Sequence, residues 1–287
     1  MGVSVKKNRG DMASLGYSGQ IINPEVGTLM SGFAPLRAYR KKHSDLWLRA
    51  FVIEDSCRTL FLQFDTIAID EYLFRQIKRI ADGHGIAEDH LIVSASHTHS
   101  GPVGLVNTQE GIFKGIYGLF GNYDQEMVSA VLAKTDQLIA EAIKNLEEIS
   151  TLKFARGNLK GIGTERHDPK LPGDDRLTVW SYQTISGRKY LFYNFACHPT
   201  ILNGTSEFLS SDFPGATAEL LQREYQAVCF INGSCGDIST RFTRTTEGRR
   251  QIEIFAELLT EKIVSLSKDQ LLPPGYGIRL FEALVCA

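Results

Sequence analysis

Two closely spaced histidines are the first residues in this 287-residue chain whose types and spacing suggest chemistry. His97 and His99 are two positions apart and follow the short apolar run 91–95. Residues i and i+2 at the end of a strand project to the same side, so both imidazoles can face one point. Imidazole suits zinc and similar divalent metals, and catalytic zinc sites commonly have three protein ligands and a water. The spacing indicates a metal site; the alternative is two loop histidines bonded to the backbone.

A third histidine, His198, follows another apolar run at 189–195. Pro199 favours an extended conformation at His198 and ends the strand there. Alone, His198 is more simply a core histidine with satisfied hydrogen bonds, but beside the first two it supplies a further imidazole. Asp65 and Asp212 are the acidic candidates by loop position. For them we favour simpler roles, a strand-end turn residue and a helix cap, respectively.

The segment Asn-Gly-Ser-Cys-Gly-Asp-Ile-Ser-Thr, which follows the apolar run 227–231, is the third polar loop. Its glycines permit backbone conformations that expose N–H groups, which suits an oxyanion. Ser239 becomes a nucleophile if a base such as His99 lies within hydrogen-bond reach, whereas the alternative is a plain turn. Cys235 is a further candidate nucleophile, although a thiol in such a turn is more often inert. No GxSxG sequence is present, so an α/β-hydrolase triad is not supported.

The elements that must position these loops follow from hydrophobic patterning. Apolar and β-branched runs predict strands at 47–54, 59–67, 91–95, 151–156, 177–182, 189–195, 227–231 and 278–285. Helical spacing of apolar residues predicts helices at 70–83, 123–148, 212–223 and 247–267. Hairpins combined with strand–loop–helix units predict an α/β fold, a mixed β-sheet flanked by helices on both faces in an α/β/α sandwich. Ligands gather where loops leave strand C-termini in such sheets, and all three polar loops do so.

Composition narrows the classes of function. The net charge is -2 without a basic stripe, which argues against nucleic acid as a partner. Neither a transmembrane segment nor a signal peptide is evident, so we expect a cytoplasmic protein. Five cysteines without a CxxC pair predict free thiols. The length fits one domain spanning 1–287.

Several short motifs, taken together and in order, resemble the N-terminal catalytic domain of the neutral/alkaline non-lysosomal ceramidase family. The most specific is His-Thr-His-Ser-Gly-Pro at 97–102. The others are IINPEVG at 21–27, SDLWLRA at 44–50, NFACHP at 194–199, SSDFPGA at 210–216 and GDIS at 236–239. The similarity runs through most of the chain.

The resemblance implies a zinc-dependent hydrolase of an N-acyl amide. It implies zinc ligands at His97 and His198, and catalytic residues at His99, Arg166, Asp237 and Ser239. In this family the zinc ion polarises the carbonyl and activates water, while a histidine at the position of His99 handles protons. The serine matching Ser239 is a nucleophile or a substrate-positioning residue.

The sequence also departs from the family pattern. The family completes its zinc shell with a glutamate and a tyrosine that fall beyond position 287, and it carries an immunoglobulin-like C-terminal domain. We therefore expect 1–287 to be a single ceramidase-like N-terminal α/β domain that lacks the C-terminal part. The family's GDxSPN is GDISTR here. The substrate is expected to be a small or lipid-like acylated amide, with ceramide itself left open.

Two alternatives to this hydrolase remain. One is a non-catalytic ligand-binding homologue with an incomplete metal site. The other is a site that a longer natural chain or a partner subunit completes, for example in a homo-oligomer.

Overall fold

A nine-stranded sheet forms the body of the protein, for which the computed structural model describes residues 13–268 and 271–272. The strand order is β13-β11-β10-β8-β1-β5-β6-β7, with β15 paired to β8. The bounds are β1 (Ser14–Ile21), β5 (Trp47–Glu54), β6 (Arg58–Phe64), β7 (Leu91–Ala95), β8 (Glu147–Asn158), β10 (Arg176–Thr184), β11 (Lys189–Phe195), β13 (Ala227–Asn232) and β15 (Leu271–Leu272). The β6–β7 and β11–β13 pairs are parallel and the other pairs are antiparallel, so the sheet is mixed.

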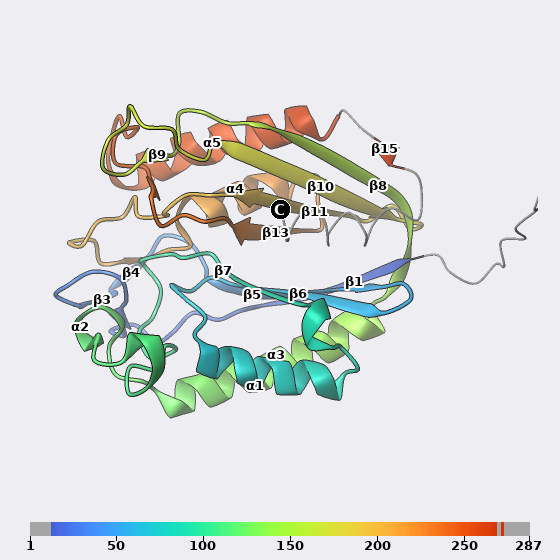
Figure 1. The fold of residues 1–287 in the computed structure, drawn as a ribbon, viewed down its shortest axis with the longest axis horizontal. Coiled ribbons are helices and arrows are strands. Elements are labelled where there is room, and N and C mark those ends of the chain that lie inside the picture. The colour runs from blue at the N-terminus through green and yellow to red at the C-terminus, as the bar shows by residue number, and fades with distance from the viewer. Residues whose placement is uncertain (1–12, 269–270, 273–287) are drawn as a thin grey trace, which may run out of the picture.

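Helices cover both outer faces of this sheet, as Figure 1 shows. One face is covered by α1 (Glu71–Gly83) and α3 (Gln125–Lys144), and the other by α4 (Asp212–Leu221) and α5 (Gly248–Leu266). The predicted fold class, a mixed sheet flanked by helices on both faces, is confirmed. Short elements complete the fold: β2 (Leu29–Met30), β3 (Arg37–Ala38), β4 (Lys41–Lys42), α2 (Tyr117–Phe120), β9 (Thr164–Glu165), β12 (Phe208–Leu209), β14 (Ile238–Ser239) and the 3₁₀ turns Glu88–His90 and Gly111–Phe113.

The sheet folds back on itself, a feature that the sequence did not predict. Figure 1 shows β1, β5, β6 and β7 in one layer and β8, β10, β11 and β13 in a second layer. The buried side chains form three clusters, one under each pair of helices and one between the strand layers. The inner cluster is aromatic: the Phe192 ring lies 4.9 Å from the Phe51 ring and 5.5 Å from the Trp180 ring. Burial of these large rings gives both strand layers an apolar inner face, which drives the folding back.

Strand β1 lies in the middle of the sheet order but was missed from the sequence. Its segment is rich in serine and glycine, which are weak strand signals. Gly16 has a packing reason: a Cβ there would lie 1.9 Å from the Ala142 carbonyl oxygen of α3. The predicted helix 123–148 ends at Lys144 because residues 147 and 148 instead pair with β1. The strand predicted at 278–285 lies outside the described residues.

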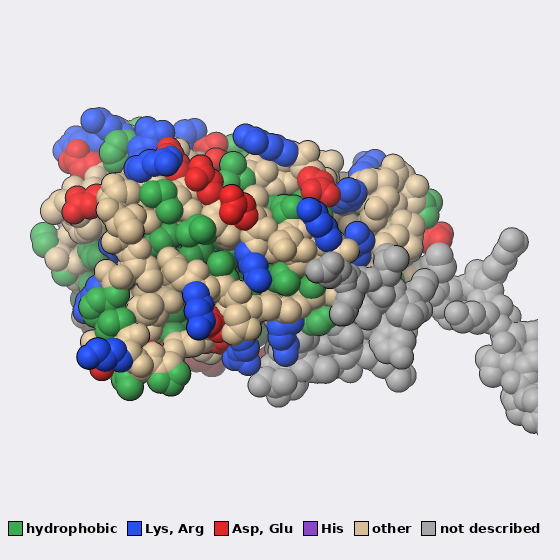
Figure 2. Space-filling model, turned by 90° about the horizontal axis from the view of Figure 1, so that it is seen from above, with side chains coloured by type: hydrophobic (Ala, Val, Ile, Leu, Met, Phe, Trp, Pro, Cys, Tyr) green, Lys and Arg blue, Asp and Glu red, His purple; other side chains and the backbone are tan. Residues whose placement is uncertain are grey.

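The surface agrees with the near-neutral composition. On the face seen in Figure 2, Lys and Arg side chains are interspersed with Asp and Glu side chains. Among the described residues, no helix is both long enough and apolar enough to cross a membrane. The four described cysteines are free thiols, while Cys286 lies outside the described residues.

Candidate metal centre

Three imidazoles from two distant parts of the chain converge on one point. The Nε2 atom of His97 lies 3.0 Å from Nε2 of His198 and 3.4 Å from Nε2 of His99. One nitrogen from each ring lies within 4.8 Å of the other two. The predicted meeting of His97 and His99 with His198 is therefore present in the structure.

The hydrogen bonds of the other ring nitrogens fix the tautomer of each histidine. Each Nδ1 contacts a backbone carbonyl oxygen: His97 that of Ile67 at 2.6 Å, His99 that of Gly32 at 3.1 Å and His198 that of Cys235 at 2.6 Å. A carbonyl oxygen only accepts, so each Nδ1 carries the hydrogen and donates it. A neutral ring then has a lone pair on Nε2. Three lone pairs consequently face one another, an arrangement that repels unless a cation lies between them.

Burial disfavours protons as that cation. Desolvation is the largest cause lowering the pKa of His99 to about 3 and that of His198 to about 4, and neighbouring histidines lower both pKa values further. Burial also lowers the pKa of His97, and the positive charge of Arg166 contributes. Neutral imidazole is the form that binds metals, so the rings are in their ligand state near neutral pH.

The donor set fits a divalent metal ion. Nitrogens bound to tetrahedral zinc at about 2.0–2.1 Å lie roughly 3.3 Å from each other, and the observed 3.0 and 3.4 Å separations bracket that value. The backbone carbonyls bonded to each Nδ1 are the outer partners that orient ligand histidines in metal sites. The cluster could therefore hold a metal with little rearrangement.

The His97 and His99 rings converge for a reason other than the side-chain alternation of a strand, which the sequence analysis expected. β7 ends at Ala95, and His97 has φ 66°, in the left-handed region that non-glycine residues rarely adopt. The turn is held by His97 N–H donating to the Thr66 carbonyl at 2.9 Å and by the buried Thr98 hydroxyl donating to the Ser210 carbonyl at 2.6 Å. A strained turn, rather than strand alternation, aims the two rings. Such strain is typical of functional sites.

Asn232, at the end of β13, ties together the two chain segments that carry the histidines. Its Nδ2 donates to the Ser96 carbonyl at 3.2 Å and to the Cys197 carbonyl at 3.3 Å, and its Oδ1 accepts from the Cys197 N–H at 3.3 Å. Ser96 and Cys197 directly precede His97 and His198. One amide side chain thus sets the separation of the two rings, and sequence reasoning did not identify it.

Ser239 lies on a small second sheet, in which β14 pairs with β9, and Arg166 directly follows β9. Ser239 is buried and forms a backbone bridge with His198, and its hydroxyl accepts from the Arg241 N–H at 3.2 Å. Arg166 donates from Nη1 to the Gly236 carbonyl at 2.9 Å and from its N–H to the Asp237 carbonyl at 2.7 Å. The side chain of Asp237 is exposed. The structure thus places all the predicted site residues in neighbouring segments, with Asp237 contributing through its backbone.

The simpler roles given to the acidic candidates are partly confirmed. Asp65 is buried, and its carboxylate lies 3.4 Å from the guanidinium of the buried Arg49. The carboxylate also accepts a hydrogen bond from the Trp47 N–H, so the role of Asp65 is structural. Asp212 was expected to cap its helix, but Ser211 occupies the N-cap position. Asp212 has φ 56°, and its carboxylate accepts from the N–H groups of Ile201 and Phe213, at 3.0 and 2.8 Å. It therefore anchors the loop that follows His198 to α4.

Two further residues support the cluster. Arg37 donates from Nη2 to the His99 carbonyl at 3.2 Å and from Nε to the Ser206 carbonyl. Its guanidinium lies 4.9 Å from the Phe33 ring centre, and that ring lies 5.1 Å from the His99 ring. No local sequence signal marked either residue. Burial raises the pKa of the Cys235 thiol, which favours the inert form expected for it.

Comparisons with known proteins identify the family of this chain. A sequence model of the family described as "Neutral/alkaline non-lysosomal ceramidase, N-terminal" matches residues 16–170. The match covers more than half of the chain, and the chain belongs to this family.

Similar proteins include the "Neutral ceramidase" of Drosophila melanogaster, 25% identical over 252 residues, covering 76% of this chain and 34% of that protein. The "Neutral ceramidase A" of Dictyostelium discoideum is 25% identical over 250 residues, covering 79% of this chain and 34% of that protein. The matched region thus spans about a third of the length of these relatives.

Solved structures support the fold. A structure titled "Ceramidase complexed with C2" aligns with a TM-score of 0.77 at 18% identity, covering 90% of this chain and 44% of that one. The neutral ceramidase from Pseudomonas aeruginosa also aligns with a TM-score of 0.77, at 17% identity, covering 90% of this chain and 45% of that one. At these identities, the likeness establishes the shared α/β architecture.

Proposed function

We propose that this chain is a zinc-dependent hydrolase of N-acyl amide bonds that acts on a small or lipid-like acylated substrate. Family membership supports amide hydrolysis, because the relatives are named ceramidases. The observation that carries the zinc assignment is the convergence of three Nε2 lone pairs whose opposite nitrogens donate to backbone carbonyls.

In this proposal His97 and His198 hold the zinc ion. When bound there, zinc supplies Lewis-acid polarisation of the amide carbonyl and activation of water. His99 Nε2 is the free ring nitrogen that receives a proton and passes it to the departing amine nitrogen, since Nδ1 is committed to the Gly32 carbonyl.

The remaining site residues bind and orient the substrate. Arg166 lies close enough for its charge to lower the pKa of both His97 and His198, and the same charge stabilises negative charge that develops on the carbonyl oxygen. The Ser239 hydroxyl, next to His198, positions the amide. Asp237 acts through its backbone carbonyl, which holds the Arg166 N–H.

The test uses the purified chain loaded with zinc and a panel of N-acyl amides with short to long acyl chains. We expect turnover by the wild type and loss of both zinc and turnover in His198→Ala. His99→Ala should keep zinc but lose turnover by about 10²–10⁴-fold, as expected for removal of a proton-transfer group. Full activity in His99→Ala would remove His99 from the chemistry, and loss of zinc would make it a ligand instead.

The same experiment distinguishes the non-catalytic alternative. If zinc-loaded protein turns over none of the panel while an N-acyl amide still raises its thermal stability, the chain is a ligand-binding protein. The hydrolase proposal would then be wrong for this chain.

A further inference from the structure

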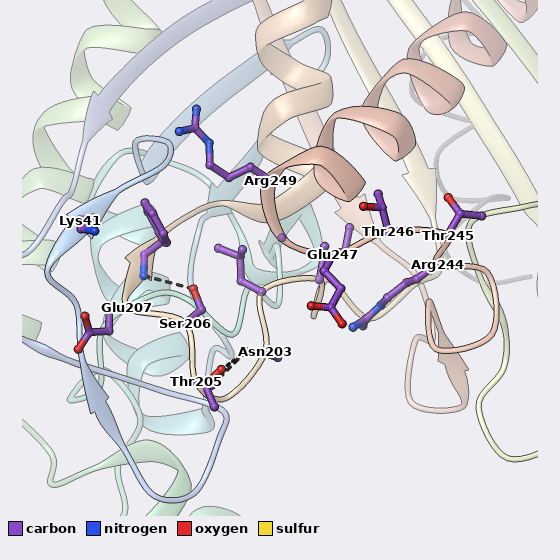
Figure 3. Close-up of a pocket in the computed structure, with 14 residues that line it drawn as sticks. Lys41, Asn203, Thr205, Ser206, Glu207, Arg244, Thr245, Thr246, Glu247 and Arg249 are labelled. Atoms are coloured by element: carbon purple, nitrogen blue, oxygen red, sulfur yellow. Dashed lines mark hydrogen bonds between the residues drawn. The ribbon is translucent and has the colours of Figure 1, made fainter.

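A second site lies in the recess formed by the loops that follow His198 and Ser239. This recess has a volume of about 760 Å³, and its walls are Lys41, residues 201–203 and 205–208, and residues 244–249 (Figure 3). A volume of that order is typical of small-molecule sites. The three histidines do not line it, so it is distinct from the metal centre.

Positive charge dominates the lining. Lys41, Arg244 and Arg249 come from three separate parts of the wall, as Figure 3 shows. Among the described residues, none of the three has a carboxylate within 4.0 Å. The lining also has two carboxylates: Glu207, which is already paired with Arg40 at 3.2 Å, and Glu247, which is exposed at the N-cap of α5. The recess therefore carries cationic charge in excess.

Arg244 is the most constrained of these cations. It is half-buried, and its Nη2 donates to the Thr200 carbonyl at 2.7 Å while its Nε donates to the Thr240 hydroxyl at 2.8 Å. Both partners are neutral oxygens, and the buried Asp212 carboxyl balances part of the charge of the guanidinium without forming an ion pair with it. Desolvation lowers the pKa of Arg244, which reflects the free-energy cost of holding this charge away from water. An anion in the recess would offset that cost.

The rest of the lining provides neutral hydrogen-bonding groups. The side chains of Asn203, Thr205, Ser206, Thr245 and Thr246 supply amide and hydroxyl groups around the cations. The positive end of the α5 dipole also points to this region, because α5 starts at Gly248. Cations that surround hydroxyl-lined space are suited to a phosphate group attached to a polar body.

We propose that this recess binds a small, soluble phosphate monoester with a hydroxyl-bearing body, whose phosphate lies among Lys41, Arg244 and Arg249. The proposal rests on the recess itself and is independent of the hydrolase assignment. Arg249 is exposed and takes no part in the hydrogen bonds that hold the loops, so its substitution tests phosphate binding without disturbing the loops.

The experiment titrates inorganic phosphate and glycerol phosphate into metal-free protein by calorimetry, at constant ionic strength with chloride as the reference anion. We expect saturable binding that weakens at least tenfold in Arg249→Gln. The matched control is Arg79→Gln, which removes an exposed arginine from α1 and should leave phosphate binding unchanged.

Phosphate would also bind any metal ion left at the histidines, so the titration is repeated in metal-free His198→Ala. Binding that persists there assigns the anion to the recess, and binding that disappears overturns the proposal. The proposal also fails if wild-type binding does not saturate, or if Arg249→Gln and Arg244→Gln bind as tightly as the wild type. Binding to vesicles that contain phosphatidic acid, without binding to either soluble probe, would assign the cations to a membrane surface instead.

Discussion

The metal centre and the recess proposed to bind phosphate are neighbours, but their side chains are held in place in different ways. In the metal centre every ring is held twice, by the fold of its loop and by a backbone carbonyl at Nδ1. In the recess, Lys41 on β4 and Arg249 in the first turn of α5 are exposed, and neither has a carboxylate within 4.0 Å among the described residues. The histidine rings are therefore fixed by hydrogen bonds within the fold, whereas only Arg244 among the three cations of the recess is held in that way. Substitutions should therefore affect the two regions very differently.

Removal of a ligand histidine should give the largest effect. His198→Ala leaves His97 as the single proposed ligand histidine, so we expect zinc affinity to fall by more than about 100-fold, since loss of outer partners alone costs about 10–100-fold. Competition against a chelator of known affinity measures this. His84→Ala, a histidine paired with Asp136 on the surface, is the control and should keep full affinity. Similar losses in the two variants would refute a specific centre.

Substitution of Asn232, whose side chain links the two histidine segments, should cause the second-largest loss of zinc affinity. Asn232→Ala removes three hydrogen bonds from the segments before His97 and His198, so we expect zinc affinity to fall about 10–100-fold. The free energy of unfolding of the metal-free protein should fall by about 1–3 kcal/mol because polar groups lose their partners.

Asn194→Ala is the matched control for this prediction. Asn194 donates to the Ile231 carbonyl at 2.9 Å on the same pair of strands without touching the histidine segments. It should lower stability but leave zinc affinity unchanged. If both variants bind zinc equally, Asn232 does not set the geometry of the site.

The buried carboxyl of Asp212 should make stability depend on pH beside the metal centre. Burial raises its pKa to about 6, above the ordinary value near 4, so the folded protein binds the proton more tightly than the unfolded chain. This contribution is fully present below about pH 4 and is lost as the pH rises through 6, by up to about 3 kcal/mol.

Asp212→Asn should lack that contribution. Denaturant unfolding of metal-free wild type and variant from pH 4 to 7.5 gives two curves, and their difference isolates Asp212 from the titrating histidines. We expect the wild type to lose stability relative to the variant as the pH rises. Parallel curves would show that the carboxyl has an ordinary pKa.

Arg249→Gln should have the smallest effect on the folded protein. Exposed substitutions of this kind usually change stability by no more than about 0.5 kcal/mol, so the free energy of unfolding and the zinc affinity should stay unchanged while phosphate binding weakens. Chelator competition and denaturant unfolding on this one variant check the contrast. A large loss of zinc affinity would mean that the two regions are coupled rather than independent.

Sequence patterns were sufficient for the parts of the fold that depend on hydrophobic periodicity. Strands β5, β7 and β11 have the predicted bounds, since each is a short apolar run between polar turns. Strand β1 was missed because serine and glycine are weak strand signals, and the contact with α3 that requires Gly16 is tertiary information. The folding of the sheet into two layers was also missed, because an aromatic strand does not reveal which layer it faces.

The site could be predicted only as a set of residues. Histidines at the ends of β7 and β11 pointed to a shared edge of the sheet, and His97 and His198 do meet there. The positive φ of His97 and the Asn232 cross-tie depend on loop conformation, for which spacing gives no signal. Sequence thus indicates which residues gather, while hydrogen bonds to backbone carbonyls determine how they are aimed.

Zinc K-edge X-ray absorption on the zinc-loaded protein reports which atoms bind the metal ion. We expect scattering from at least two imidazole nitrogens at about 2.0–2.1 Å, with one imidazole fewer in His198→Ala loaded at a zinc concentration high enough to overcome its weakened affinity. A spectrum with only oxygen or sulfur ligands, or one that is unchanged in His198→Ala, would contradict it.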